Sequence, residues 1–390
     1  MRFIFNKIII HLSIFIIPIF DTMKIRRVGP VEYNIVRFSM LMNIWWIGCK
    51  VYKNPITSLK TVRKLIQRFT KMMGKKKMVR AYKLDGKYNW DMFNPAWPSP
   101  GFDAFFRSHL LEENTTEKES SSIRRLIIAI TKRCPLQCEH CSEAATLYKK
   151  DVLSYNQLVD KIDPFVDAGI GQLVLSGGEP LSRFDDLIKI LNRYKSKCDQ
   201  WLYTSAFGLT YDKALLLKKA GLNGAAISLD HHIEKEHNLF RGNKKSYFWV
   251  LEGIKNLQKA GVLVSINVCP TKEYIEQSGP ESMIALAKEL EIPIVNFLEP
   301  RAVGNYQSKD VELHPVHFDR LASLSEEYNF DKNLFDSPTV LFPAAYRKST
   351  PCGGGVSYIF LDYDGTLYPC PFCKVKMPEV KSDAQLCVAS

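Results

Sequence analysis

Three cysteines within eight residues form the first group that could do chemistry: Cys134, Cys138 and Cys141, in the segment Cys-Pro-Leu-Gln-Cys-Glu-His-Cys. Thiolates are ligands of zinc ions and of iron–sulfur clusters, and both kinds of site need four ligands. His140 could complete a zinc site, but adjacent side chains rarely converge on one small ion. A cluster held by three cysteines leaves one iron open for another ligand, which favours a role in chemistry.

A second group of cysteines lies in the last 39 residues: Cys352, Cys370, Cys373 and Cys387. Asp364-Gly365 stands between two short apolar runs and predicts a hairpin turn that brings Cys370 beside Cys352. Cys370-Pro-Phe-Cys373 adds a spacing found in metal sites. We therefore expect a second metal centre here, and a structural zinc ion is the alternative to a cluster.

The rest of the chain has the composition of an ordinary folded protein. Of its 390 residues, 46% are hydrophobic and 24% are charged, which excludes a disordered or fibrous protein. A Gly-X-Y repeat, a sustained heptad and a series of long apolar runs are all missing from the sequence, which excludes collagen, coiled coils and multi-span membrane proteins. Clustered cysteines in so long a chain indicate metal binding in a reducing compartment rather than a disulfide framework.

From residue 123 onward, short apolar runs alternate with helical patterns, which predicts a parallel sheet with helical crossovers. The expected strands are Leu126–Thr131, Gln172–Leu175, Trp201–Thr204, Gly224–Leu229, Val262–Val268 and Ile292–Phe297. The expected helices are Ser154–Ala168, Arg183–Tyr194, Asp212–Ala220, Ser246–Ala260 and Pro280–Leu290. Six strands are too few for a closed eight-stranded barrel, so we predict an α/β fold with a partial (β/α)6 TIM-like barrel. Ligands of such sheets bind at the carboxyl ends of the strands, where the first three cysteines and Ser176–Pro180 lie.

Two of these segments resemble motifs of the radical S-adenosylmethionine (radical SAM) enzymes. The Cys-x-x-x-Cys-x-x-Cys spacing follows the first strand, and Gly177-Gly178-Glu179-Pro180 follows the second. His140 holds the place where these enzymes usually have an aromatic residue. The resemblance implies a [4Fe–4S] cluster on Cys134, Cys138 and Cys141, bound S-adenosylmethionine, and an electron donor such as flavodoxin or ferredoxin.

The resemblance also implies a mechanism and further cofactor-binding residues. The cluster cleaves S-adenosylmethionine reductively, and the resulting 5′-deoxyadenosyl radical abstracts hydrogen from the substrate. Gly177 and Gly178 would let the backbone approach the cofactor, and Glu179 would hold its ammonium group, unless Glu179 only caps the next helix. Ser228 resembles a residue near the ribose, and Arg241 resembles an arginine that meets the cofactor carboxylate; Asn267 is a weaker candidate.

The C-terminal cysteines resemble the SPASM or twitch extension of radical SAM enzymes, which holds auxiliary iron–sulfur clusters. Cys352, Cys370, Cys373 and Cys387 suffice for one auxiliary [4Fe–4S] cluster, although a full SPASM domain has more cysteines. Cys387 is the least certain ligand because it lies three residues from Ser390.

The basic charge is concentrated in the N-terminal region. The net charge is +12, yet residues 1–80 contain 17 Lys and Arg against Asp21 and Glu32, a balance of +15. This uneven distribution argues against nucleic acid as a partner. Phe3–Phe20 is mostly apolar without a signal-peptidase site, and Ile56–Met73 has the pattern of an amphipathic helix with a basic face. Two interpretations stay open: contact with an anionic membrane surface, or packing on the protein with the basic face in water.

We therefore divide the chain into a basic amphipathic region (1–78), a hairpin and linker (79–122), a radical SAM partial barrel (123–312) and a SPASM- or twitch-like cysteine-rich extension (313–390). Asp85-Gly86 predicts the turn of the hairpin. The expected protein is a cytoplasmic oxidoreductase that acts on a peptide or, as an alternative, on a membrane lipid or other amphiphile. A non-catalytic iron–sulfur or zinc protein is the alternative of a different class.

Overall fold

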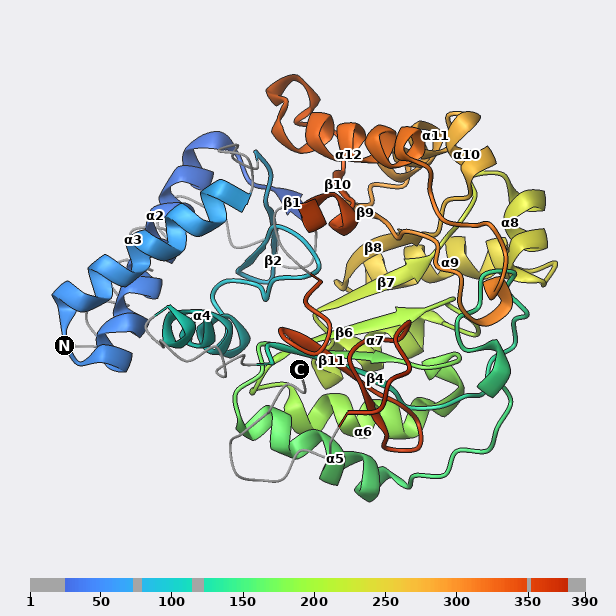
Figure 1. The fold of residues 1–390 in the computed structure, drawn as a ribbon, viewed down its shortest axis with the longest axis horizontal. Coiled ribbons are helices and arrows are strands. Elements are labelled where there is room, and N and C mark those ends of the chain that lie inside the picture. Colours follow the sequence, from blue (N-terminus) through green and yellow to red (C-terminus); the bar gives the residue numbers. More distant parts are fainter. Residues whose placement is uncertain (1–24, 73–78, 114–122, 349–351, 378–390) are drawn as a thin grey trace.

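The computed structural model describes residues 25–72, 79–113, 123–348 and 352–377. A nine-stranded sheet forms its centre, with the strand order β10-β9-β8-β7-β6-β5-β4-β11-β12 (Figure 1). The six expected strands are confirmed and pair in parallel in sequence order: β4 (Arg125–Ala129), β5 (Gln172–Ser176), β6 (Asp199–Thr204), β7 (Gly224–Ser228), β8 (Leu263–Val268) and β9 (Ile294–Phe297). This is an α/β fold. Its edge strands are β10 at one end of the strand order and β12 at the other.

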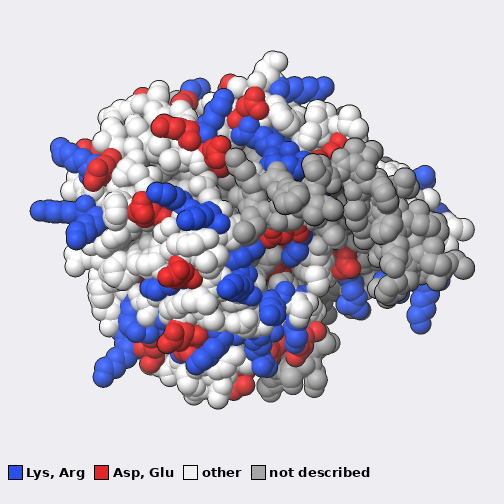
Figure 2. Space-filling model, turned by 180° about the vertical axis from the view of Figure 1, so that it is seen from behind, with Lys and Arg blue, Asp and Glu red and all other residues white. Residues whose placement is uncertain are grey.

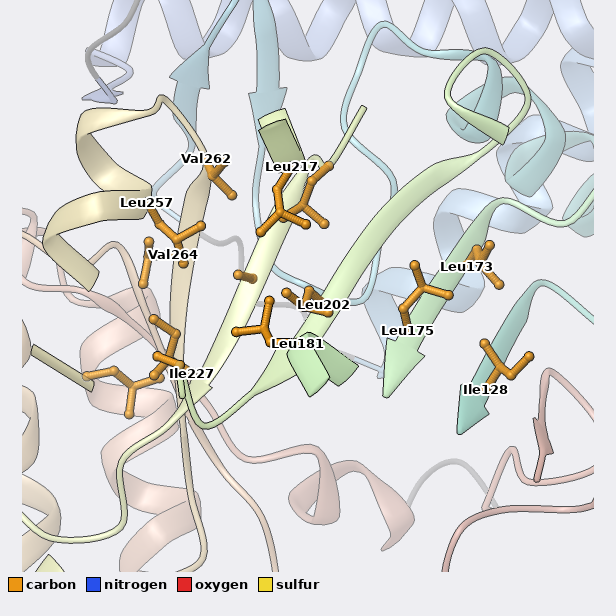
Figure 3. Packing of buried hydrophobic residues seen from close by; sticks show 14 of the residues in the cluster. Ile128, Leu173, Leu175, Leu181, Leu202, Leu217, Ile227, Leu257, Val262 and Val264 are labelled. Atoms are coloured by element: carbon orange, nitrogen blue, oxygen red, sulfur yellow. The ribbon is translucent and has the colours of Figure 1, made fainter. Parts of the chain in front are cut away.

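Helices cover one face of this sheet. The five expected helices are confirmed as α5 (Tyr155–Asp167), α6 (Phe184–Tyr194), α7 (Tyr211–Ala220), α9 (Ser246–Lys259) and α11 (Gly279–Glu289). Every second strand residue packs on this side, and Leu175, Leu202, Leu217 of α7 and Leu257 of α9 belong to the same buried cluster (Figure 3). Burial of this apolar face stabilises the sheet and fixes the directions of the strand ends.

Several elements were not expected from the sequence: α8 (Glu234–Arg241), α10 (Lys272–Glu276), α12 (Pro315–Phe330) and β10 (Thr339–Leu341). The two strands of the expected C-terminal hairpin are β11 (Tyr358–Leu361) and β12 (Leu367–Tyr368). The hairpin turn at Asp364-Gly365 is confirmed, because β11 and β12 pair antiparallel around it. However, β11 also pairs in parallel with β4, and β10 pairs in parallel with β9. The described strands of the C-terminal region, β10, β11 and β12, therefore extend the main sheet at both of its edges.

The predicted N-terminal hairpin consists of β2 (Tyr82–Leu84) and β3 (Lys87–Asn89), and β1 (Arg26–Arg27) pairs with β2. Asp85 and Gly86 both have positive φ angles, 50° and 73°, as a type I′ turn requires. The hairpin covers the sheet face that the helices leave open. There Tyr82, Leu84 and Met92 pack against Val174, Trp201, Leu263 and Ile294.

Three helices form the N-terminal unit beside the sheet in Figure 1: α2 (Pro30–Tyr52), α3 (Pro55–Met72) and α4 (Pro100–Glu112), of which α4 was not expected. The apolar stripe expected at Ile56–Met73 is mostly packed within this unit, since Val62 and Leu65 are buried with Leu110 of α4. The interpretation of α3 as a helix packed on the protein is therefore the better one. Three features of the sequence lie outside the described residues: Phe3–Phe20, residues 114–122 of the expected linker, and Cys387.

Charged residues of both signs are mixed over the described surface visible in Figure 2. This mixture agrees with the balance of 36 basic and 39 acidic residues in positions 81–390. Among the helices of the described residues, none is long and apolar enough to cross a membrane.

His109 connects α3 and α4 and gives the first prediction. Its ring is buried, Arg68 Nη2 lies 2.9 Å from Nδ1, and burial lowers its pKa to about 4 despite Glu112, with Arg124 also disfavouring its charge. The unfolded chain therefore binds one more proton between about pH 4 and 6.5, so stability falls as the pH falls through this range. His109→Gln should remove this dependence: relative to the variant, wild type should lose about 2 kcal/mol between pH 7.5 and pH 5 in denaturant unfolding. Equal pH dependence of both proteins would contradict a neutral, buried His109.

Candidate functional site

The loop of Cys134, Cys138 and Cys141, here called the cysteine loop (residues 131–143), leaves the carboxyl end of β4 and touches the turn after β5. Gly178 N–H donates to the Thr131 carbonyl oxygen at 2.8 Å, and Glu179 N–H donates to that of Arg133 at 2.7 Å. A Cβ atom on Gly177, whose φ is +149°, would lie 2.4 Å from the Thr131 oxygen, and one on Gly178 would lie 2.5 Å from the Arg133 oxygen. The close approach of the cysteine loop therefore requires glycine at both positions. The sequence alone suggested a different reason, the approach of a cofactor.

The same loop is held from two further sides. Glu139 N–H donates to the Phe240 carbonyl oxygen at 2.9 Å. Asn305 donates from its backbone to the Cys141 carbonyl oxygen at 3.0 Å and from Nδ2 to that of Cys138 at 2.9 Å. The positions of the three cysteines are consequently set by α8 and by η3 (Gly304–Tyr306) as well as by the loop itself.

The three thiols lie near one another at this edge of the sheet. Burial raises the pKa of Cys134 to about 12 and that of Cys141 to about 11. The neighbouring Cys138 adds to the rise in both pKa values. Metal coordination would remove these thiol protons. Within the described ranges no three His, Cys, Asp or Glu side chains converge closely enough to hold a single metal ion. Three thiols on one loop, with the Arg241 guanidinium donating to Cys138 Sγ, form a donor set that suits the thiolate ligands of an iron–sulfur cluster.

His140 packs as an aromatic residue would. Its ring stacks on Phe240 with centroids 4.8 Å apart and planes inclined by 17°. Burial lowers its pKa to about 4, so the ring is neutral near pH 7. This geometry gives a physical reason why histidine replaces an aromatic residue here, and it does not place His140 among the metal ligands.

Glu179 is fully engaged by protein donors. Oε1 accepts from Thr204 Oγ1 at 2.7 Å and from Leu181 N–H at 3.0 Å, and Oε2 accepts from Ser205 Oγ at 2.5 Å and Ser205 N–H at 2.7 Å. Burial raises its pKa, and these hydrogen bonds oppose the rise. In this structure the Glu179 carboxylate caps η2 (Pro180–Arg183) and joins the ends of β5 and β6. The expected contact of Glu179 with an ammonium group stays a prediction.

Arg241, at the end of α8, connects the cysteine loop to the end of β7. Nε and Nη2 both lie 2.5 Å from Asp230 Oδ2, and Nη1 donates to Cys138 Sγ at 3.6 Å. Burial disfavours the Asp230 charge, but Arg241 holds the pKa of Asp230 below its ordinary value. His237 is fully buried and accepts from Asp230 N–H at 3.2 Å. Arg241 thus reaches a cysteine thiol, where an arginine for a cofactor carboxylate was expected.

A row of polar residues crosses the carboxyl ends of three neighbouring strands. Ser228 of β7 is in register with Asn267 of β8, which is in register with Asn296 of β9. Asn296 Nδ2 donates to Asn267 Oδ1 at 2.8 Å, while the buried Asn296 Oδ1 has no partner among the described residues. Asn296 was missed in the sequence, although a polar residue near the end of an apolar strand was an available signal. This row can bind a polar ligand at the same sheet edge as the cysteine loop.

A buried charge network attaches the C-terminal hairpin to the cysteine loop, and no local pattern of residues predicts it. Lys132 is completely buried, pairs with Glu143, and lies 2.7 Å from Asp362 Oδ1. Lys374 lies 2.6 Å from Glu143 Oε1 and 3.5 Å from Asp362 Oδ2. Burial disfavours the Lys132 charge, but the two carboxylates raise its pKa above the ordinary value. Two cations and two anions therefore balance one another beside Cys134.

The C-terminal cysteines meet at the other end of β11. Tyr358 Oη lies 3.8 Å from Cys352 Sγ, and the pKa of Tyr358 is raised first by burial and then by Cys352 and Cys370. Burial raises the pKa of Cys370, and the neighbouring Cys352 and Cys373 add to this rise. Three of the four expected ligands are brought together in this way, and the fourth, Cys387, lies outside the described residues.

Comparison with known proteins agrees with this arrangement. The family model described as Radical SAM superfamily matches residues 128–277. The GTP 3′,8-cyclase of Aliarcobacter butzleri (strain RM4018) is 31% identical over 230 residues, which make up 57% of this chain and 68% of that protein.

Two solved structures share the fold. SuiB of Streptococcus suis bound to its precursor peptide SuiA is similar over 72% of this chain and 69% of its own, with a TM-score of 0.57 and 16% identity. anSMEcpe with bound AdoMet is similar over 67% of this chain and 78% of its own, with a TM-score of 0.51 and 19% identity.

The cysteine loop, the turn after β5 and the matched residues 128–277 lie in one parallel sheet, at the edge where its ligands bind. The chain belongs to the radical SAM superfamily and is an enzyme of the class that uses a [4Fe–4S] cluster and S-adenosylmethionine.

Proposed function

We propose that this enzyme abstracts hydrogen from a peptide substrate with Cys134, Cys138 and Cys141 as the ligands of its catalytic cluster. The observation that carries the proposal is the cysteine loop, which Gly178, Glu179 and Asn305 hold at the carboxyl end of β4 with its three thiols near one another. When bound, the cluster and S-adenosylmethionine supply the 5′-deoxyadenosyl radical. A flavodoxin or ferredoxin in the cytoplasm would supply the electron.

The residues of the chain have distinct parts in this proposal. Gly177 and Gly178 set the position of the cysteine loop, and Glu179 holds the adjoining turn. Arg241 donates to Cys138 Sγ and thereby stabilises the thiolate that a cluster requires. Ser228, Asn267 and Asn296 would orient a polar part of the cofactor or substrate, because they lie in register across the same strand ends.

The solved structures support a peptide substrate. SuiB was solved with its precursor peptide, and anSMEcpe was solved with the peptides Kp18Cys and Cp18Cys. Their likeness to this chain extends over about two thirds of it or more, and beyond the segment that the family model matches.

A nucleotide is the second candidate substrate, because the GTP 3′,8-cyclase is the more similar protein in sequence, at 31% identity. The two can be separated with the reconstituted enzyme by measuring 5′-deoxyadenosine formation. A short peptide encoded beside the gene should accelerate it and become modified, whereas GTP should not. Acceleration by GTP with consumption of GTP would replace the peptide with a nucleotide.

We also propose that Cys352, Cys370, Cys373 and Cys387 hold an auxiliary [4Fe–4S] cluster of a SPASM- or twitch-like kind. The mutual proximity of the first three thiols supports this proposal. The Tyr358 hydroxyl beside Cys352 would donate a hydrogen bond to a ligand sulfur. A structural zinc ion is the alternative occupant of this site.

Removal of the catalytic ligands should separate the two metal sites. Anaerobic reconstitution should give about eight irons per chain, as two [4Fe–4S] clusters require. Changing Cys134, Cys138 and Cys141 together to Ala should remove about half of this iron and abolish cleavage of S-adenosylmethionine. Full zinc occupancy without visible charge-transfer absorbance would show that the cysteines do not hold clusters.

Gly178→Ala tests the contact between the β5 turn and the cysteine loop. The new Cβ would press on the Arg133 carbonyl, a strain of about 1–3 kcal/mol, so iron bound at the catalytic site and cleavage of S-adenosylmethionine should both fall at least about tenfold. Gly29→Ala is the matched control, because nothing lies within 4 Å of its Cβ position. Equal iron content and activity in the two variants would show that the contact does not position the loop.

Cys370→Ala tests the auxiliary site separately. We expect the loss of about half of the iron with retention of uncoupled cleavage of S-adenosylmethionine, because the catalytic ligands remain. Metal analysis of wild type and variant is the measurement. One zinc per chain that the variant loses, with an unchanged iron content, would identify this site as structural zinc.

A further inference from the structure

The side of α2 that faces away from the protein is apolar. Its large exposed residues recur at steps of three or four, so they form one stripe along the helix. Each has between 40% and 75% of its surface exposed. We call this set the outer stripe: Val31, Ile35, Phe38, Met42 and Trp46.

The opposite side of α2 is also apolar and already has a partner. Val36, Ile44 and Ile47 are buried. Ile44 and Ile47 pack in one cluster with Val62 and Leu65 of α3. A helix that packs on protein through one face normally presents polar residues on the other. The outer stripe therefore remains as an unpartnered apolar surface, of the kind that marks an interaction site.

Cations surround this surface without matching anions. Residues 30–72 contain eight Lys and Arg but only one acidic residue, Glu32. Glu32 already binds Arg26 at 2.7 Å and Tyr88 at 2.9 Å. Arg68 pairs with Glu113, and for the other seven cations no salt bridge is found among the residues that the structure describes.

Apolar and basic residues alternate where α2 turns into α3. Trp46 lies at the end of the outer stripe, and Lys50 Nζ lies 5.9 Å from the centroid of its ring. Ile56 and Leu59 of α3 are exposed and stand next to Lys60 in sequence or within a turn of it. Trp and Lys side chains of this kind suit a boundary between lipid and water, because each has an apolar body and a polar end.

We propose that the outer stripe, with Ile56 and Leu59, binds the surface of an anionic lipid bilayer, so that α2 lies in the plane of the interface. Charge complementarity favours this partner, because anionic headgroups would pair with cations that lack protein partners. Most of the proposed lipid contact is thus made by α2, with only the start of α3, whereas the amphipathic pattern of the sequence pointed to α3 as a whole. The proposal does not depend on which substrate the enzyme uses.

Two other occupants fit the charges less well. A second copy of this chain would bring two groups of unpaired cations together, which opposes pairing. Residues 1–20 are apolar enough to cover the stripe, but they contain Arg2 and Lys7 and no acidic residue. Neither would neutralise the Lys and Arg side chains around α2.

Vesicle co-sedimentation of the full-length, reconstituted protein tests the proposal. The probes are vesicles of phosphatidylcholine alone and vesicles with added phosphatidylglycerol. The stripe variant carries Ile35→Ser, Phe38→Ser and Trp46→Ser. The control variant carries Leu239→Ser, Phe248→Ser and Val316→Ser. These residues lie on α8, α9 and α12 and are exposed to a degree comparable with the three stripe residues.

Wild type and the control variant should bind anionic vesicles, and the stripe variant should bind at least about tenfold more weakly. Salt should weaken the binding of wild type without abolishing it, because screening acts on the cations and not on the apolar contact. Iron content and uncoupled cleavage of S-adenosylmethionine should be equal in all three proteins, which separates this result from a failure of the catalytic proposal.

Three outcomes would overturn the proposal. The first is equal vesicle binding by the stripe variant and wild type. The second is loss of binding only when Ile9→Asp and Ile16→Asp are introduced into the full-length protein, which would make residues 1–20 the membrane contact. The third is a dimer of wild type that the stripe variant lacks, without vesicle binding, which would make a second copy the occupant.

Discussion

The catalytic site depends on one close backbone contact, between the cysteine loop and the turn after β5. Two hydrogen bonds, from Gly178 to Thr131 and from Glu179 to Arg133, hold the two backbones together at distances that exclude a Cβ atom. The carboxylate of Glu179 fixes the other side of the same turn to Thr204 and Ser205. Adjacent strands β4, β5 and β6 therefore position the three thiols as one unit, because the loop cannot shift without breaking these bonds.

The charges around the loop extend this constraint to both sides. Arg241 spans Asp230 and Cys138, so the end of β7 is tied to a cysteine ligand. Lys132, two residues before Cys134, pairs with both Glu143 and Asp362. These ion pairs attach the C-terminal hairpin to the cysteine loop. Buried charges of this kind are costly when a partner is removed, because the remaining charge stays desolvated. They are therefore better understood as devices that fix geometry than as sources of stability.

The sequence predicted what depends on local patterns. Strand and helix periodicity gave the six central strands and five helices, and Asp85-Gly86 and Asp364-Gly365 gave both hairpin turns. It did not predict pairings between distant segments, such as Tyr358 of β11 beside Arg125 of β4, because no local signal specifies a partner. Capping of η2 by Glu179 was one of the two roles that its sequence position suggested. Its hydrogen bonds from Thr204 and Ser205 were not predicted, because these donors belong to the end of a separate strand.

The short strand β11 gives the two cysteine groups a defined relation. Its first residue, Tyr358, lies beside Cys352, and Asp362, directly after its end, lies beside Lys132 and hence the cysteine loop. Since β11 runs in register with β4, Tyr358 and Asp362 lie four residues, or about 13 Å, apart along the same pair of strands. Lys374, directly after Cys373, pairs with Glu143, so the chain returns from the C-terminal cysteines to the cysteine loop. Strand pairing with β4 and this ion pair together hold the two cysteine groups in one fixed relation, because neither group can shift without breaking one of these contacts.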